Sequence, residues 1–362
     1  MRKFLGPLLR TTASALALTA LCSPAHARPA VPAAPPAPEA TRLGFAERYH
    51  AVQHGGFVRA ADTTITCRSP EAPDCAAARA GQGGVNDDFD MFYVDVDDNP
   101  DTYNSSRAEV RVPEGGRVTY ARLYWGGNLR VGEQKPPADD GRVLIAEPGG
   151  AYKELLADTV VGHQVAHGAD AYQASADVTE LVRGSGSGLY TVAQVNTAMG
   201  RSAAGAWGGW TLVVAYENPA EPLRTLSLWD GFDALDQPLD VRLRGVRVPA
   251  GASGRAGLVA YDGDRDSSGD SLTLSPGPRR TPVALGDAAD PPDDVLNSTI
   301  SEPDDLPAQR VPAYVNTLGY DSDVFDLAPA LQRGGDQPGF RLVSHADTAW
   351  AGVLFAAVDA QV

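Results

Sequence analysis

Long hydrophobic runs, cysteine and lysine are all scarce in this sequence. Beyond the first 27 residues no apolar run approaches the roughly 20 residues that a membrane-spanning helix needs, and the chain ends at Val362 without the hydrophobic, basic tail of a wall-sorting signal. We therefore expect the mature chain to be released, with no transmembrane segment. Only three lysines, Lys3, Lys135 and Lys153, accompany many arginines, a bias typical of a GC-rich bacterial genome.

Positive charge is scarce as well. Lysine and arginine number 30 against 46 aspartates and glutamates, which gives a formal net charge of −16. A chain this acidic repels phosphate backbones and anionic lipid surfaces. We therefore expect no nucleic-acid partner.

The first 27 residues have the layout of a secretory signal peptide. Arg2 and Lys3 precede an apolar run over 13–21, and Ala25-His26-Ala27 forms a small-x-small cleavage site. Cleavage after Ala27 predicts a secreted, extracellular protein and changes the formal charge from −16 to −19, because three basic residues and no acid are removed. A buried helix is the alternative, but its sequence would not run from basic to apolar to proline-rich.

Two cysteines remain after this cleavage, Cys67 and Cys75. They are separated by turn-forming Ser, Pro and Asp residues in an exported chain, a pattern that predicts one disulfide closing a short loop. Two buried free thiols are an alternative. A metal pair is a weaker one, because no second Cys or His pair lies nearby.

The pattern of apolar residues predicts an all-β fold. Residues 28–45 are rich in Pro and Ala and are expected to be an extended linker. After them, short runs of Val, Leu, Tyr and Thr alternate with Gly, Pro, Asn and Asp, with almost no helical period. The candidate strands are 55–60, 108–113, 117–125, 142–146, 158–163, 172–178, 189–195, 210–216, 224–230, 240–249, 256–262, 270–274, 320–327, 339–345 and 351–358.

Two of these strands resemble each other and divide the chain. WGGWTLVVAYE begins at Trp207 and WAGVLFAAVD at Trp350, and each is an apolar run typical of a strand buried on both faces. Three further segment pairs recur in the same order: 109–115 with 245–251, 121–127 with 257–263, and 177–182 with 323–328. The repeats predict two jelly-roll-like β-sandwich lobes, at 46–218 and 219–362, arising by internal duplication. Chance alignment of two Gly- and Val-rich β segments is the alternative.

Clusters of aspartate are the most suggestive candidates for a site. Calcium prefers six to eight oxygen ligands, and alternating acids on a loop can supply several. The candidate ligands are Asp95, Asp97, Asp101, Asp262, Asp264, Asp266 and Asp270. Neither loop is an EF-hand, because Pro100 and Ser106 occupy the positions of the required Gly and Glu in the first, and Thr273 the position of that Glu in the second. Solvated turns are the alternative for these acids, and a pair of carboxylates for glycoside hydrolysis is another.

Other patterns carry little chemistry. His163 and His167 have the spacing of a zinc helix, but Gln164 replaces the general-base Glu and the surroundings lack a helical pattern. The segment 184–188, GSGSG, is expected to be a hairpin turn. In YARLYWGG, alternation is expected to place Tyr124 on the outer face of a strand and Trp125 on the inner face. No catalytic residues are predicted, and the ligand-binding residues stay unknown.

Several motifs in a fixed order resemble a known family. They are TITCRSPEAPDCAAAR, NDDFDMFYVDVDDNPDTYNSS, YARLYWGG, YQASADVTELV, GWTLVVAYENPAEPLRTLSLWDGF, GDSLTL, LNSTIS and NTLGYDSDVFD. They are similar to the N-terminal β-region of secreted actinobacterial proteins that are uncharacterised or adhesin-like. The resemblance covers most of 57–359 and implies an extracellular β-sandwich module without established enzymatic activity.

These patterns together predict a secreted, non-enzymatic surface or adhesin-like module that binds a protein or glycan, with no certain cofactor and calcium as a candidate. A carbohydrate-active protein, either a lectin-like jelly roll or a glycoside hydrolase using loop carboxylates, is the alternative function. A structural coat protein that associates with itself is the third.

Overall fold

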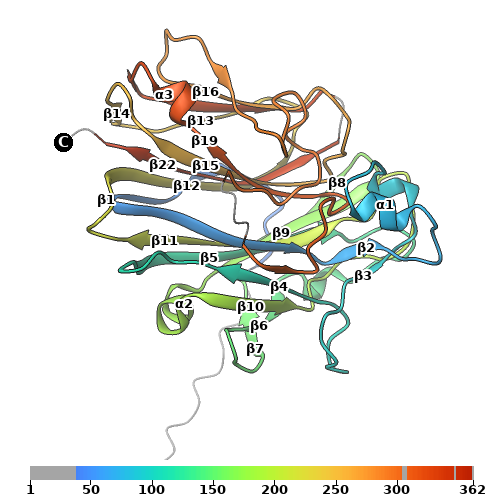
Figure 1. Cartoon of the computed structure of the whole chain (residues 1–362). Coiled ribbons are helices and arrows are strands. Elements are labelled where there is room, and N and C mark those ends of the chain that lie inside the picture. The colour runs from blue at the N-terminus through green and yellow to red at the C-terminus, as the bar shows by residue number, and fades with distance from the viewer. Residues whose placement is uncertain (1–37, 304–307, 346–347, 361–362) are drawn as a thin grey trace, which may run out of the picture. The chain divides into compact units, whose positions relative to one another are not determined.

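The described part of the chain is almost entirely β-structure. A computed structural model describes residues 38–303, 308–345 and 348–360 (Figure 1). Strands make up 48% of the chain and helices 7%, which confirms the predicted all-β class. The predicted signal peptide and residues 28–37 of the predicted linker lie outside the described residues.

The strands follow the apolar runs of the sequence. In chain order they are β1 (Leu43–Thr63), β2 (Ile65–Cys67), β3 (Met91–Tyr93), β4 (Ser105–Val110), β5 (Arg117–Asn128), β6 (Arg142–Ala146), β7 (Lys153–Leu156), β8 (Thr159–Ala166), β9 (Ala169–Asp177), β10 (Gly188–Ala193), β11 (Gly208–Glu217), β12 (Leu223–Ala234), β13 (Leu239–Arg242), β14 (Arg247–Val248), β15 (Gly254–Tyr261), β16 (Ser271–Ser275), β17 (Val283–Ala284), β18 (Arg310–Val311), β19 (Tyr320–Asp326), β20 (Gly335–Asp336), β21 (Gly339–Val343) and β22 (Trp350–Asp359). The helices are short: α1 (Cys75–Arg79), α2 (Thr179–Ser185), α3 (Ala328–Leu331) and the 3-10 turns η1 (Asn86–Asp88) and η2 (Pro137–Asp139).

The long strand β1 joins two halves of one large sheet. The strand order is β19-β15-β22-β12-β1-β11-β5-β9-β8. β1 pairs with β12 from Leu43 to His54 and with β11 from Gly55 to Thr63. Gly55 marks the change of partner: it has φ +128°, and a Cβ there would lie 2.1 Å from the carbonyl oxygen of Tyr216. Only glycine fits this backbone position.

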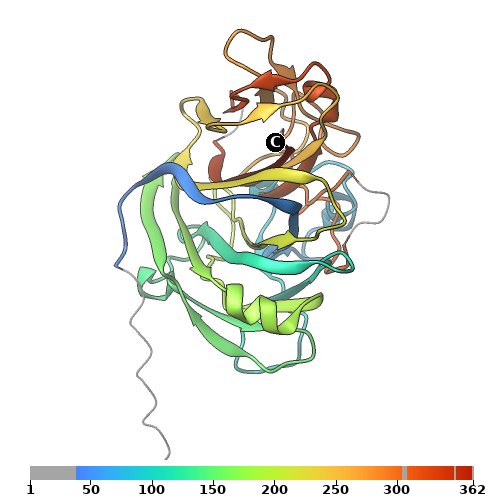
Figure 2. The ribbon, with the colours of Figure 1, turned by 90° about the vertical axis from the view of Figure 1, so that its left-hand side faces the viewer.

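The two halves of this sheet face each other. One buried cluster contains Tyr124 of β5 and Val213 of β11 together with Phe232 of β12 and Trp350 of β22. Side chains from strands on both sides of β1 therefore meet in a shared core. Figure 2 shows the two halves as neighbouring layers, with β1 passing between them.

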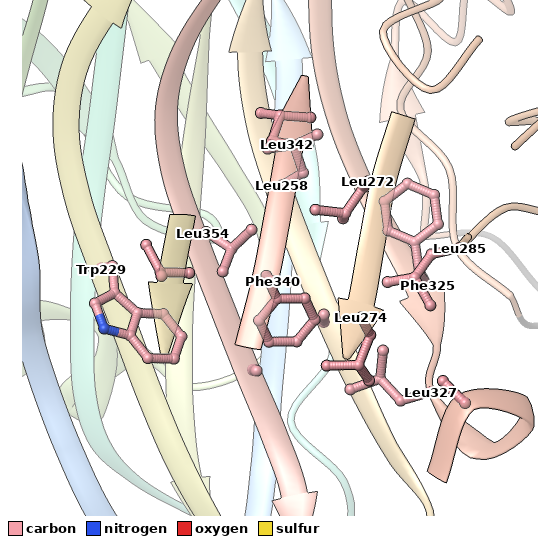
Figure 3. Packing of buried hydrophobic residues seen from close by; sticks show 14 of the residues in the cluster. Trp229, Leu258, Leu272, Leu274, Leu285, Phe325, Leu327, Phe340, Leu342 and Leu354 are labelled. Atoms are coloured by element: carbon pink, nitrogen blue, oxygen red, sulfur yellow. The ribbon is translucent and has the colours of Figure 1, made fainter. Parts of the chain in front are cut away.

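A smaller sheet covers the outer face of each half. The sheet β18-β4-β10-β6-β7 packs on β5, β9 and β11, and the sheet β13-β21-β16-β17 packs on β12, β15, β19 and β22. Figure 1 shows β10 and β6 below the central layers and β13 and β16 above them. Figure 3 shows the second of these cores, where Phe340 and Leu274 of the outer sheet meet Leu258 and Leu354 of the central sheet. Each lobe is thus a β-sandwich with its own apolar core.

The two lobes share the same connectivity. Around β1 and β12, the order β1-β11-β5-β9 repeats as β12-β22-β15-β19, and the outer order β4-β10-β6-β7 repeats as β13-β21-β16-β17. Helix α2 follows β9 as α3 follows β19. Three of the four segment pairs found in the sequence lie on equivalent elements of this scheme, namely β5 with β15, the end of β9 with the end of β19, and β11 with β22. In the fourth pair, 109–115 includes the end of β4 whereas 245–251 includes β14 and not β13, the counterpart of β4. The shared connectivity supports duplication, which itself stays a prediction.

No single position in the chain separates the two lobes completely. The core of the first lobe contains residues between Ala60 and Val214, and the core of the second contains residues between Trp229 and Val358. The connection 218–222 lies between these ranges. The first half of β1, however, pairs with the second lobe, and β1 begins at Leu43, inside the segment predicted as linker.

The predicted disulfide is present. The Cys67 and Cys75 sulfurs are bonded to each other, with a Cα–Cα distance of 5.7 Å. Both residues are buried, and the bond ties β2 to the start of α1. Among the described residues, no helix is long and apolar enough to cross a membrane.

Two local predictions were wrong. Tyr124 does not lie on an outer face: it is as fully buried as Trp125, because β5 lies between two packed layers. The segment 184–188 is not a hairpin turn. Ser185 ends helix α2, and Gly186, with φ +69°, turns the chain into β10.

Candidate functional site

A pocket lies beside the point where β1 changes partner. Its volume is about 600 Å³, and it is lined by β1 from Gly56 to Arg59, by the ends of β15 and β22, and by the chain that follows β4. Small-molecule sites in proteins usually measure about 300–1,000 Å³. The switch of partner in β1 therefore leaves a hollow large enough for a ligand.

Three aromatic side chains line the pocket. They are Phe57 of β1, Tyr216 of β11 and Phe355 of β22. The rings of Phe57 and Phe355 are 5.3 Å apart between centroids, and Phe355 is 3% exposed. Gly257 of the neighbouring strand leaves room for Phe355, since a Cβ at that glycine would lie 2.0 Å from the ring atom Cζ. The aromatic lining is therefore held in one position by close packing.

Charged side chains of both signs surround these rings. Among the residues that the structure describes, four arginines and three glutamates line the pocket: Arg59, Arg111, Arg224, Arg255, Glu109, Glu221 and Glu302. The described part of the pocket lining is thus net positive in a chain of net charge −16.

Several of these charges hold one another in place. Arg111 Nε donates to Glu109 Oε2 at 2.7 Å, and this hydrogen bond keeps the pKa of Glu109 below its usual range. Arg224 donates to Glu221 at 2.9 Å and to Asp359 at 3.1 Å. Tyr216 donates its hydroxyl to Glu221 at 3.0 Å, and burial raises the pKa of this phenol. The rim is preorganised, which lowers the entropy lost when a ligand binds.

Arg59 is the most buried cation of the pocket. It is 4% exposed, and its Nη2 donates to the carbonyl of Ser301 at 2.5 Å. Its Nη1 lies 3.7 Å from Glu302 Oε1, an ion pair without a hydrogen bond. Among the described residues its Nε has no hydrogen-bond partner. A buried guanidinium normally has its donors satisfied, so this one is under-partnered.

Buried carboxyl groups position the segment that carries Ser301. Thr299 Oγ1 lies within hydrogen-bond distance of both Asp290, at 2.5 Å, and Asp323, at 3.0 Å, and the Ser301 amide donates to Asp323 at 2.9 Å. Burial raises the pKa of Asp290 to about 6, against hydrogen bonds from Ser301 and Thr299 that lower it. Burial and the nearby carboxylates Asp290 and Asp321 raise the pKa of Asp323 well above its usual range. This network holds Glu302 at the pocket.

Asp140 is another carboxyl group with an altered proton affinity. Its Oδ1 accepts a hydrogen bond from Asn196 at 2.7 Å, while its Oδ2 is buried without a hydrogen-bond partner among the described residues. Burial raises the pKa of Asp140 to about 8, against the Asn196 hydrogen bond, and the charges of Glu39, Asp170 and Asp139 raise it further.

Replacement of Asp140 by asparagine is expected to reduce the pH dependence of stability. The folded chain keeps this proton up to about pH 8, whereas the unfolded chain releases it near about pH 4. The stabilisation is therefore complete below about pH 4 and is lost as the pH rises through about 8. Denaturant unfolding at several pH values should show the free energy of unfolding of Asp140→Asn rising relative to that of the wild type as the pH rises. The upper bound of this change is about 1.4 kcal/mol per pKa unit. A difference that stays constant with pH would contradict this assignment.

The first aspartate loop forms turns within itself. Asp95 accepts a hydrogen bond from Ser105 Oγ at 2.7 Å. Asp97 accepts from the Asn99 amide at 3.0 Å and from Thr102 at 3.1 Å, and Tyr152 donates to its other oxygen. Burial opposes these bonds, but they hold the pKa of Asp97 below its usual range. The backbone of Asp101 donates to Asn99, so this loop is an Asx-type turn.

The second aspartate loop lies at the end of β15 away from the pocket. Asp262 accepts hydrogen bonds from Asn86 at 2.9 Å and from Thr348 at 3.2 Å. The amide of Asp266 donates to Asp294 at 3.0 Å, and Asp270 forms a β-bridge with Asp294. Asp264 is half-buried in the same turn.

The predicted calcium ligands therefore lie in two separate turns. The described residues contain no group of three or more His, Cys, Asp or Glu side chains placed to hold a metal ion. The contacts above give several of these carboxylates a structural role, and calcium binding stays a prediction.

The histidines and tryptophans singled out by the sequence have structural surroundings. His163 contacts Asp170 at 3.2 Å and His167 contacts Asp236 at 2.8 Å, so each faces a different carboxylate. All five tryptophans lie in apolar cores, among them Trp207 and Trp350. They support the fold and leave Phe57 and its neighbours as the aromatic surface at the pocket.

Comparison with known proteins adds no relative. No protein-family model, curated protein sequence or solved structure matches the chain.

The sequence did not identify the pocket residues. They come from β1, β4, β11, β12, β15, β19, β22 and the loops beside them, which are far apart along the chain. The one local signal is Gly55-Gly56 in the middle of a strand pattern, since glycine inside a strand often marks a close backbone approach.

Proposed function

We propose that this chain is a secreted, non-enzymatic surface or adhesin-like binding module whose ligand occupies the pocket beside β1. The observation that carries the proposal is an aromatic lining, at Phe57, Tyr216 and Phe355, enclosed by charged groups of both signs. Rigid aromatic surfaces with a few directed polar groups are typical of recognition sites. The signal-peptide pattern at 1–27 and the resemblance to secreted surface proteins support an extracellular setting.

The order of the pocket supports recognition of a preferred ligand. Arg224 is tied to Glu221 and Asp359, and Arg111 to Glu109, before any ligand arrives. Such a rim presents fixed donors and acceptors and does not need to reorganise. A surface protein or glycan is the proposed class of partner.

Blocking the pocket is expected to weaken binding strongly. Ser253 is exposed and lines the rim, so Ser253→Trp fills the entrance without disturbing a core. On arrays of neutral and acidic glycans and of peptides, the chain from Arg28 to Val362 should bind at least one class, and Ser253→Trp should weaken that binding about tenfold or more, about 1.4 kcal/mol.

The matched control for this experiment is Ser268→Trp. Ser268 is also an exposed serine, and it lies in the loop at the other end of β15. Its replacement should leave binding within about twofold of the wild type. Equal loss in both variants would contradict the pocket as the site. Self-association of the chain without binding to either array would favour the coat-protein alternative.

A carbohydrate-active enzyme is the second candidate, because Glu109, Glu221 and Glu302 line the same pocket. Glycoside hydrolysis requires two carboxylates on opposite sides of the scissile bond, one of them able to donate a proton. Release of reducing ends from a bound glycan, lost in Glu302→Gln, would support that function. Binding without release would support the module proposed above.

A further inference from the structure

Arg59 indicates the charge of the ligand. This guanidinium is almost completely buried. Among the described residues its ion pair is with Glu302, at 3.7 Å, and its Nε has no hydrogen-bond partner. A cation removed from water is stable when an anion or several acceptors satisfy it. Because Arg59 lines the pocket, an anion bound there would lie close to this guanidinium and add to the charge balance that Glu302 provides only in part.

The surroundings of Arg59 leave its charge incompletely balanced. Asp290 and Asp323 lie nearby, but their hydrogen bonds come from Thr299 and Ser301, and among the described residues neither of them is hydrogen-bonded to Arg59. Arg255, which is exposed, adds a second guanidinium to the pocket wall. Positive charge concentrated in a hollow of an acidic protein attracts a negatively charged ligand.

The glutamates restrict the kind of anion. A phosphate group carries about −1.5 to −2 charges at neutral pH and would lie against Glu109, Glu221 and Glu302. A single carboxylate accompanied by hydroxyl groups suits this wall better. Hydroxyls both donate and accept hydrogen bonds, so they can pair with the glutamates and the arginines in turn.

The aromatic lining points to a ring as the body of the ligand. The half-buried Phe57 offers apolar surface next to the charged groups, and Phe355, which is 3% exposed, packs behind it. Aromatic side chains pack well against groups with one apolar face and one polar edge, and a pyranose ring has such a face. The ring and the carboxylate together describe an acidic sugar.

We infer that the pocket binds a carboxylate-bearing sugar residue of a surface polysaccharide, with its carboxylate at Arg59 and Arg255 and its ring against Phe57, which Phe355 supports from behind. This inference rests on the proposed function, because it takes the pocket to be the binding site. It adds the chemical class of the ligand and names the groups that bind its negative charge.

Calorimetric titration of the chain from Arg28 to Val362 with two probes tests the inference. The probes are an oligogalacturonate and its carboxyl-reduced neutral counterpart. The acidic probe should bind about tenfold more tightly or better, since a hydrogen bond to a charged group contributes that much. Raising the ionic strength from about 0.05 M to about 0.5 M should weaken the acidic probe more than the neutral one. Equal affinity for the two probes would overturn the inference.

Arginine variants test which side chains bind the carboxylate of the acidic probe. Arg255→Gln should reduce the preference for the acidic probe about threefold or more, and Arg59→Gln about tenfold. Arg244→Gln is the control, since Arg244 is exposed and is not one of the pocket residues. Because the buried Arg59 variant can fail to fold, the exposed Arg255 variant keeps the test decisive. If both variants fold and both keep the full preference for the acidic probe, the inference is overturned. If Arg59→Gln does not fold, an unchanged preference in Arg255→Gln overturns it.

The Ser253→Trp variant separates this inference from the proposed function. If the two probes bind to the wild type with equal affinity and Ser253→Trp blocks both, the pocket is the binding site and the inference of an acidic sugar is wrong. If it leaves acidic-probe binding unchanged, both the site and the inference are wrong. If neither sugar probe binds but an acidic peptide does, and Ser253→Trp blocks that binding, the inferred sugar ligand is wrong and the pocket remains the binding site.

Discussion

Trp350→Ala is expected to lower the free energy of unfolding by about 3–5 kcal/mol. Trp350 is fully buried between the two facing halves of the central sheet. Its ring stacks on Phe232 at 5.4 Å and lies 6.5 Å from Trp207. Removing the indole leaves a cavity where both lobes meet, and denaturant unfolding of the chain from Arg28 to Val362 measures the cost.

Phenylalanine variants provide the control for this prediction. The Nε1 of Trp350 has no hydrogen-bond partner among the described residues, whereas the Nε1 of Trp125 donates to the Asp140 carbonyl at 2.8 Å. Trp350→Phe should therefore cost less than Trp125→Phe, by about 1 kcal/mol for the hydrogen bond lost. A larger cost for Trp350→Phe would contradict the lack of a hydrogen bond at its Nε1.

Gly257→Ala is expected to lower the free energy of unfolding by about 3 kcal/mol, the upper end of the range usual for an added methyl group in a packed core. The new Cβ would lie 2.0 Å from Phe355 Cζ, and β15 cannot retreat because it is paired with β19 and β22 on both sides. The ring of Phe355 would have to move, and this ring lines the pocket. Ligand affinity should fall together with the unfolding free energy.

Gly44→Ala is the matched control for Gly257→Ala. Gly44 is also in a strand, and a Cβ there would meet nothing within 4 Å. This variant should change the unfolding free energy by no more than about 0.5 kcal/mol and leave ligand affinity unchanged. Equal effects of the two substitutions would contradict the close packing of Phe355 on Gly257.

Most strands could be predicted because their signal is local. Short runs such as 210–216 and 351–358, rich in Val, Leu and Ala and bounded by turn residues, became β11 and β22. The first half of β1 was missed, since LGFAERYHAVQ contains polar and charged residues along most of its length. Its stability depends on pairing with β12, about 180 residues further along the chain.

Predictions about strand faces failed where more than two layers stack. Alternation assumes one inner and one outer face, which holds for an edge layer but not for β5, where Tyr124 and Trp125 are both fully buried. The helix at Thr179–Ser185 was missed because a helix of this length has almost no periodic signal of its own. Its position after β9 is matched by α3 after β19.

The candidate site could not be predicted in the same way. The aspartates stood out because they are close together in the sequence, and in the structure they serve their own turns. The pocket residues were not conspicuous, since Phe57 and Arg59 belong to an ordinary strand pattern. Their importance comes from facing Phe355 and Glu302, nearly 300 and 243 positions away along the chain.

The sequence by itself determined the all-β class, the positions of most strands and the Cys67–Cys75 disulfide, because alternation, turn residues and cysteine spacing act between neighbours along the chain. Only the tertiary structure decided how the strands are layered, that β1 is shared by both lobes, and that a pocket with Arg59 lies where it changes partner. Those features depend on contacts between distant segments. Such contacts are set by how the apolar faces of whole sheets bury one another, which no local pattern records.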